Sequence, residues 1–223
     1  MYGRAFLLLL LLAGDITGRC QQRPPAITTR AALNTTTATD PGKEMVPLRQ
    51  VIPGILLDIR YATPNNFTGR PQYKKAAAYM RRRPAEALKK VQEELAKKGL
   101  CLKIYDAYRP YSVTVALWNA TTDKRYVANP RRGSHHNRGI AADLTLADLR
   151  TGRELDMGTG FDNFTDSAHH AFAALPAQVL ANRRLLKGLM WKHGFNFVPT
   201  EWWHYHWRDK NYEVLDIDLA ELE

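Results

Sequence analysis

The chain has 223 residues, of which 45% are hydrophobic and 24% charged, and its formal net charge is +10. This composition excludes a disordered or fibrous chain, and the length suffices for one sizeable hydrophobic core. The positive charges stand in scattered pairs typical of solvated helix faces, without the interleaved aromatic and basic residues of a nucleic-acid module. We therefore expect one globular domain and no nucleic-acid partner.

Residues 1–20 have the layout of a secretory signal peptide. Arg4 precedes an apolar run from Ala5 to Ala13, and small and polar residues follow as far as Cys20. The run is shorter than the roughly 20 residues of an ordinary transmembrane helix. We expect export to the periplasm or cell envelope, with the segment cleaved or kept as an N-terminal anchor, and membrane attachment only through it. Cys20 suggests a lipoprotein, but Arg19 fits that signal poorly.

Residues 21–43 are rich in Thr, Pro and Ala and show no apolar periodicity. Such a composition predicts a disordered linker, so the folded domain is expected over residues 44–223. Cys101, within a predicted strand, is interpreted as a small buried hydrophobe rather than a disulfide partner of Cys20.

The remaining chain mixes helical and strand patterns without regular β-α-β repetition. Pro84 opens a helix whose apolar residues recur at helical spacing as far as Gly99. Further helices are expected at residues 112–118 and 179–193, and strands at 100–105, 139–146 and 202–207, with a strand or extended tail at 212–219. This order predicts an α+β fold, a single domain with a central antiparallel sheet flanked by helices.

Histidine and carboxylate residues occur together in two places. His136 stands seven residues before Asp143, and Glu201 stands three residues before His204. Two imidazoles and one carboxylate are a common catalytic zinc set that leaves a fourth position for water. These clusters therefore predict a metal centre.

Strand geometry tests this assignment, because successive side chains of a strand point to opposite faces. An odd separation cannot place His136 and Asp143 on one face, so a turn at Arg138-Gly139 must intervene. Glu201 likewise has to lie in a turn before His204. His206 shares a strand face with His204, so spacing alone leaves His206 as a rival ligand.

The stretch from Ser134 to Asp143 resembles the Ser-x-His-x-x-Gly-x-x-x-Asp motif of the D-alanyl-D-alanine dipeptidases, the VanX-like zinc D,D-dipeptidases. Glu201-Trp202-Trp203-His204 is similar to the Glu-x-x-His motif of that family. The further matching blocks are 57–63 with 65–69, 105–110 and 157–162. The blocks keep the family's order and cover about Val46 to Trp207.

This resemblance implies a D,D-peptidase/hedgehog-like fold and hydrolysis of the dipeptide D-Ala-D-Ala. It implies one Zn²⁺ per chain with the ligands His136, Asp143 and His204. Glu201 would serve as general base and then acid, and Arg109 would stabilise the oxyanion. The resemblance also places Ser134 near the substrate carboxylate, Asp162 near its ammonium group, and Tyr61 in the same pocket.

Other functions share these residues. A zinc D,D-carboxypeptidase or endopeptidase that trims peptidoglycan stems would use the same centre with a longer pocket. Two histidines and a carboxylate also form the facial triad of non-haem iron oxygenases, although Glu201 has no role there. A non-catalytic zinc-binding module would not need Glu201 either.

Several of these residues also have purely structural interpretations. Arg109 could pair with Asp106 in a loop, Asp162 could cap a following segment, and Ser134 could belong to a turn. The remaining histidines are interpreted as structural; they are His135, His169, His170 and His193.

Overall fold

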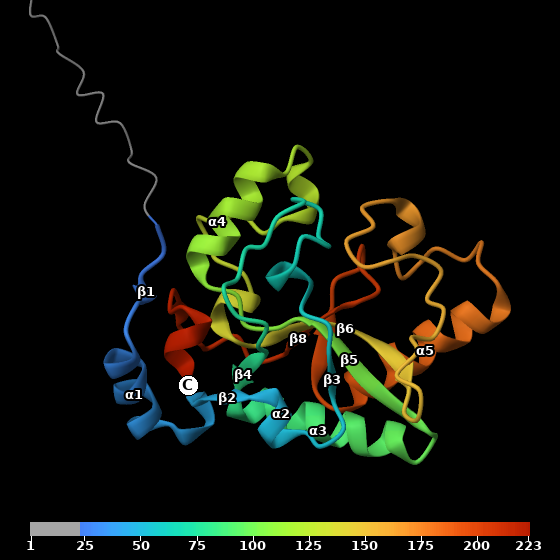
Figure 1. The fold of residues 1–223 in the computed structure, drawn as a ribbon, viewed down its shortest axis with the longest axis horizontal. Coiled ribbons are helices and arrows are strands. Elements are labelled where there is room, and N and C mark those ends of the chain that lie inside the picture. Colours follow the sequence, from blue (N-terminus) through green and yellow to red (C-terminus); the bar gives the residue numbers. More distant parts are fainter. Residues whose placement is uncertain (1–22) are drawn as a thin grey trace, which may run out of the picture.

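A five-stranded sheet lies at the centre of the computed structural model, which describes residues 23–223 (Figure 1). Its strand order is β3-β5-β6-β8-β7. The strands are β3 (Leu56–Leu57), β5 (Leu100–Asp106), β6 (Ala141–Asp148), β7 (Phe195–Phe197) and β8 (His204–Trp207). All pairings are antiparallel except that of the edge strand β3 with β5, which is parallel. The predicted α+β fold is confirmed, with this one parallel pair added.

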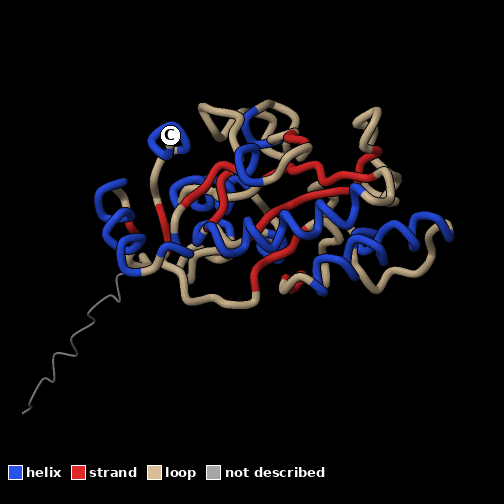
Figure 2. The backbone as a smooth tube through the Cα atoms, turned by 90° about the horizontal axis from the view of Figure 1, so that it is seen from below, coloured by secondary structure: helices blue, strands red, loops and turns tan. Residues whose placement is uncertain are grey.

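Two long helices, α3 (Arg82–Ala96) and α5 (Ala177–Lys192), contact the sheet and each other. Figure 2, seen from below, looks onto the side of the molecule on which they lie. The predicted apolar stripe of α3 is buried, with Leu88, Val91 and Leu95 fully inaccessible. Burial of such a stripe removes apolar surface from water, which is what stabilises the helix. Three shorter helices are α1 (Arg30–Thr39), α2 (Leu48–Val51) and α4 (Tyr111–Ala120).

The predicted elements appear within a few residues of their expected bounds. One difference is that β8 begins at His204 rather than Trp202, because residues 202–203 form a turn. The expected strand or tail near the C-terminus contains the short strand β9 (Val214–Leu215). Cys101 is buried in β5, as predicted.

The prediction of a disordered linker over residues 21–43 is wrong for the part that the structure describes. Strand β1 (Ala26–Ile27) pairs in parallel with β9, and helix α1 follows it. The side chain of Thr29 caps α1 by accepting a hydrogen bond from Ala32 N, and Leu33 is buried. Composition cannot reveal the pairing of β1 with β9, because it joins segments that are far apart in the chain. The signal-like residues and Cys20 lie outside the described residues.

Within residues 23–223, no helix combines the length and apolar character needed to cross a membrane.

A second, two-stranded sheet joins the ends of the domain to the central sheet. Strands β2 (Met45–Pro47) and β4 (Tyr79–Arg81) pair in antiparallel orientation. The fully buried Arg81 guanidinium donates to three backbone carbonyls, those of Lys43 at 2.6 Å, Arg138 at 3.0 Å and Glu213 at 3.3 Å. One side chain thus connects the N-terminal segment, the loop before β6 and the C-terminal segment.

Replacement of Arg81 by Met should lower the free energy of unfolding by about 3 kcal/mol or more, because several buried carbonyls lose their donor at roughly 1–3 kcal/mol each. Arg82→Met is the matched control, since Arg82 pairs with Glu44 at the surface and such pairs contribute about 0–1 kcal/mol. The free energy of unfolding of both variants is measured by urea denaturation followed by circular dichroism. Equal losses in the two variants would contradict the role given to Arg81.

Candidate functional site

A tight turn joins His136 to the strand that carries Asp143. His136 begins a 3₁₀ turn (His136–Arg138), and Gly139 ends it in the left-handed conformation with φ of 67°. A Cβ atom at Gly139 would lie 2.7 Å from the sulfur of Met45. This position therefore needs glycine both for its backbone conformation and for space. The predicted turn at Arg138-Gly139 is confirmed.

The turn and two neighbouring strands bring three candidate metal ligands together. Asp143 in β6 is the direct register partner of His204 in β8. His204 Nδ1 lies 3.0 Å from Asp143 Oδ1 and 3.2 Å from His136 Nε2, and His136 Nε2 lies 3.4 Å from Asp143 Oδ2. All three side chains are buried. They form a group that can hold a metal ion.

The imidazole of His136 is held in one orientation. Its Nδ1 lies 2.6 Å from the backbone carbonyl of Ala107, which leaves Nε2 to face Asp143 and His204. Such a hydrogen bond to the second ring nitrogen is the usual support of a metal-binding histidine. The next residue, Asn137, fixes the turn by donating to the carbonyl of Arg109 and to Thr114 Oγ1, each at 2.8 Å.

Ser134 lies at the start of the same turn. Its Oγ accepts a hydrogen bond from the backbone N–H of Asn137 at 3.0 Å, while its own N–H donates to the Asn137 side chain. The turn-residue interpretation thus describes part of its role. Ser134 also lines the cavity beside His136, and its hydroxyl hydrogen is free to act as a donor there.

The Arg109 guanidinium is buried beside this group rather than exposed in a loop. Its Nε and Nη2 both donate to Asp106 Oδ2, at 2.9 and 2.6 Å, and Nη2 lies 3.7 Å from Asp143 Oδ2. Asp106 is itself held by the Tyr73 hydroxyl at 2.7 Å. The predicted pairing with Asp106 therefore exists, and it serves to fix Arg109 inside the cavity.

Glu201 lies in the turn before β8, as the spacing required. Its backbone N–H donates to Val198 O, and its Oε2 lies 3.9 Å from His204 Nδ1. Burial, together with the charges of Asp143 and Asp162, raises the pKa of Glu201 well above its usual range. A carboxyl group with a raised pKa beside a group of candidate metal ligands is suited to accept a proton and return it.

Asp162 and Tyr61 face the same cavity from another side. The Tyr61 hydroxyl donates to Asp162 Oδ2 at 2.9 Å. Burial first, and the charge of Asp143 second, raise the pKa of Asp162 to about 7. Asp162 has φ of 56°, the only positive φ of a described non-glycine residue. Its carboxylate bonds Tyr61 and not a following backbone N–H among the described residues, so the capping interpretation does not hold.

The charges of this site leave room for a cation. Asp106 neutralises Arg109, whereas the charge of Asp143 raises the cost of ionising both Asp162 and Glu201. Buried charges in proteins are paired or coordinate metals. A divalent cation between the two imidazoles and Asp143 would supply the missing positive charge, so these residues fit a metal ion.

All eight predicted site residues line one cavity of about 590 Å³. They are Tyr61, Arg109, Ser134, His136, Asp143, Asp162, Glu201 and His204. Four basic side chains, Arg125, Arg132, Arg138 and Lys210, line the same cavity. The structure therefore assembles residues from separate segments of the chain into one site.

His206 does not belong to the group formed by His136 and Asp143. It lies on the same face of β8 as His204, as predicted, but it stacks on His135 with ring centroids 3.9 Å apart. Burial and the neighbouring imidazoles lower the pKa of His206 to about 3 and that of His135 to about 2. The turn thus brings His136 next to His204 and Asp143, whereas His206 lies in a separate group with His135 and His204.

Comparison with known proteins identifies the family of this chain. The family model described as D-Ala-D-Ala dipeptidase matches residues 42–219. The chain belongs to the D-Ala-D-Ala dipeptidase family. It is therefore a peptidase, and the family resemblance noted in its motifs is confirmed.

Three relatives, each named D-alanyl-D-alanine dipeptidase, are similar over most of their length. The Escherichia coli protein is 38% identical over 73% of this chain and 83% of its own. The Enterococcus faecium protein is 35% identical over 77% of this chain and 95% of its own. The Streptomyces coelicolor protein is 32% identical over 76% of this chain and 94% of its own.

Residues without a predicted role position the site in this family member. Asp106 holds Arg109, and Asn137 and the Ala107 carbonyl hold the turn and the ring of His136. Only Asp106 carried a sequence signal, since it stands three residues before Arg109. The other two act through backbone groups or through contacts with distant residues, which spacing does not reveal.

Gly139→Ala should weaken metal retention by roughly tenfold, because a Cβ atom strains the left-handed turn that positions His136 and also crowds Met45. Gly99→Ala is the matched control, since Gly99 has φ of 72° but a Cβ added there would meet no atom within 4 Å. Both variants should lose roughly 1–2 kcal/mol of stability from the left-handed backbone. The metal content of each variant is measured after dialysis against increasing concentrations of a chelator. Equal metal retention in Gly139→Ala and Gly99→Ala would refute the role given to the Gly139 turn.

Proposed function

We propose that this enzyme hydrolyses the dipeptide D-Ala-D-Ala to two D-alanines at a single zinc centre. His136, Asp143 and His204 are the proposed ligands, and Glu201 is the proposed general base and acid. The observation that carries this proposal is the convergence of the candidate ligands, Glu201 and Arg109 in one cavity. Membership of the dipeptidase family supports the substrate.

Zinc suits the proposed ligands better than other common cations. Two imidazoles and one carboxylate are a catalytic zinc set with an open fourth position, whereas magnesium and calcium prefer oxygen ligands alone. When bound, zinc polarises the substrate carbonyl and lowers the pKa of its water from 15.7 to about 7. Glu201 lies beside this position and would not be needed in an iron oxygenase or in a non-catalytic module.

Glu201 is proposed to move the proton. Its raised pKa allows it to take a proton from the attacking water and to hold it while the carbonyl is attacked. The same carboxyl group then donates the proton to the nitrogen of the leaving D-alanine. Its place in a turn at the start of β8 keeps it on the cavity side of His204.

Arg109 is proposed to stabilise the negative charge that develops on the carbonyl oxygen. Two hydrogen bonds to Asp106 and contact with the ring of Tyr61, 5.0 Å from Cζ to the centroid, hold the guanidinium in place. A donor that is already oriented needs no rearrangement when charge develops, which is why such groups contribute strongly to catalysis.

The cavity is lined by both acidic and basic side chains, which suits a zwitterionic dipeptide. Asp162 with Tyr61 offers a carboxylate for the substrate ammonium group. Arg138 donates to the backbone carbonyl of Ser134, and Arg132 and Lys210 line the same cavity, so positive charge is available there for the substrate carboxylate. Recognition of a free ammonium group would disfavour a longer peptide, and this distinguishes a dipeptidase from a carboxypeptidase.

Glu201→Gln should retain zinc and lose about 10²–10⁴-fold in kcat, because the amide cannot accept the proton. The control is Glu154→Gln, whose carboxylate bonds Tyr105 and Lys103 outside the cavity. Zinc content and steady-state hydrolysis of D-Ala-D-Ala are measured on the same preparations. Unchanged turnover in Glu201→Gln would eliminate this mechanism.

Asp162→Asn should raise KM for D-Ala-D-Ala by roughly 10–100-fold, since a hydrogen bond to a charged group contributes about 1.5–3 kcal/mol. Turnover of N-acetyl-D-Ala-D-Ala, which has no ammonium group, should hardly change. Asp166→Asn, at an exposed side chain, is the control. L-Ala-L-Ala and a peptidoglycan stem pentapeptide complete the panel, and preference of the native enzyme for the pentapeptide would establish a carboxypeptidase instead.

A further inference from the structure

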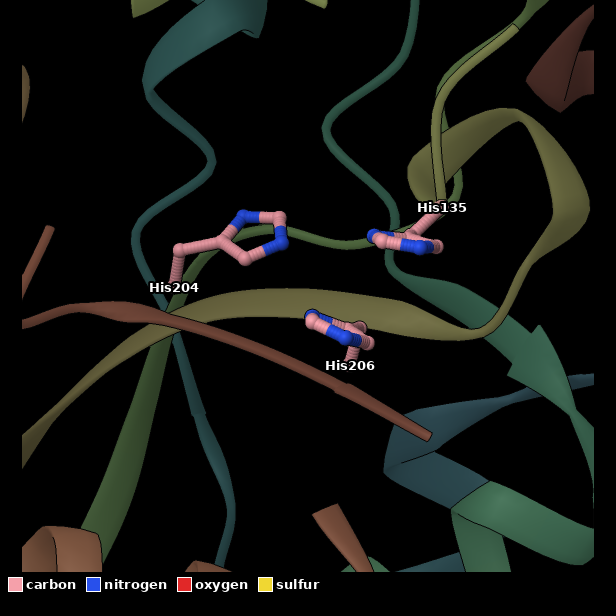
Figure 3. A group of neighbouring side chains, drawn as sticks. All are labelled: His135, His204 and His206. Carbon is pink, nitrogen blue, oxygen red and sulfur yellow. The ribbon is translucent and has the colours of Figure 1, made fainter. Parts of the chain in front are cut away.

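Two further imidazoles lie at the edge of His204 that faces away from the proposed zinc centre. Figure 3 shows the far edge of the His204 ring turned toward His135 and His206. His135 and His206 stack with an interplanar angle of 14°, and their ring centroids lie 6.3 and 5.7 Å from that of His204. One ring nitrogen of each residue lies within 4.8 Å of the other two.

The nitrogens in this cluster lack the partners that buried imidazoles normally have. His204 Nδ1 faces Asp143 and His136, but its Nε2 is buried with no hydrogen-bond partner among the described residues. His206 Nδ1 is equally buried and unpartnered there. His204 and His206 are 8% and 6% exposed, so these nitrogens have little access to bulk water.

His204 thus differs from His136 in the surroundings of its second ring nitrogen, the one that does not face the proposed zinc centre. A metal-binding histidine usually donates that N–H to a carboxylate, a carbonyl or a water, and His136 does so with the Ala107 carbonyl. The corresponding nitrogen of His204 faces two further imidazoles and no oxygen acceptor among the described residues. A cation bound between the three rings would be the simplest partner for this nitrogen.

We propose that His135, His206 and His204 Nε2 form a second site for a divalent transition-metal ion, with zinc as the ion it takes. Two neutral imidazoles and one imidazolate, that of His204, supply three nitrogen ligands to zinc and leave a fourth position for water. The absence of oxygen ligands from the described cluster disfavours magnesium and calcium. When the second ion binds, the proton on His204 Nε2 leaves to solvent, and the imidazolate of His204 bridges the two centres.

Access and charge set the order in which the two sites fill. His135 is partly exposed and lines the catalytic cavity, so an ion can enter from there. The second site contains no carboxylate among the described residues, and the Lys210 ammonium group contributes positive charge at both His135 and His206. The second ion therefore binds more weakly than the ion held with the help of Asp143.

Zinc binding to the full chain tests this site directly. Metal analysis at a series of buffered free zinc concentrations should show two equivalents for the native protein, filled in sequence. His206→Gln and His135→Gln should each lose only the weaker equivalent, whereas His136→Gln should lose the tighter one. His169→Gln is the control, because His169 lies outside the cluster, and it should keep both.

Three results would overturn the second site. The first is saturation of the native protein at one equivalent of zinc. The second is that the His135→Gln/His206→Gln double variant still binds the weaker equivalent of zinc. The third is that His206→Gln loses both equivalents. Anomalous diffraction at the zinc edge from native crystals provides a test that needs no variant. A second peak among the three rings is expected, and a water molecule there in zinc-saturated crystals would refute the site. Dipeptide hydrolysis is measured separately, so the proposed function can stand or fall independently.

Discussion

The left-handed turn at Gly139 is the constraint on which the site depends. It reverses the chain so that His136, on a loop, returns to Asp143 on the central strand β6. The turn is held from outside by Arg81, whose guanidinium bonds the Arg138 carbonyl and whose backbone N–H bonds the Gly139 carbonyl. Because Arg81 also binds the N-terminal and C-terminal segments, the geometry of the metal group is coupled to closure of the whole domain.

The sequence predicted helices α3, α4 and α5 and strands β5, β6 and β8 because their signals are local, whereas the roles of the site residues came from the family resemblance. Helix α3 follows from apolar spacing, and the turn before Asp143 follows from an odd separation that a strand cannot accommodate. The choice of His204 over His206 did not follow from spacing, since both lie on one face of β8. That choice depends on where the His136 turn ends, which is a tertiary property.

The N-terminal segment shows where local signals fail. Its threonines give little apolar periodicity, yet Leu33 is buried and Arg30 bonds the backbone carbonyls of Glu221 and Glu223. Strand β1 exists only because β9, near the opposite end of the chain, offers a parallel partner. Such a segment has the composition of a linker, yet it is ordered because it packs against the C-terminal segment.

The electrostatics of the cavity explain why one site can hold a cation, move a proton and bind a zwitterion. Burial and the charge of Asp143 raise the pKa of both Glu201 and Asp162, which prepares Glu201 for proton transfer but makes Asp162 harder to ionise. A cation at His136, Asp143 and His204 would offset the charge of Asp143, which is a cause of both shifts, and so favour the ionised form of Asp162. In the proposed enzyme, metal binding would therefore create the ammonium-binding carboxylate as well as the hydrolytic centre, and the strained backbone of Asp162 is consistent with such a specialised position.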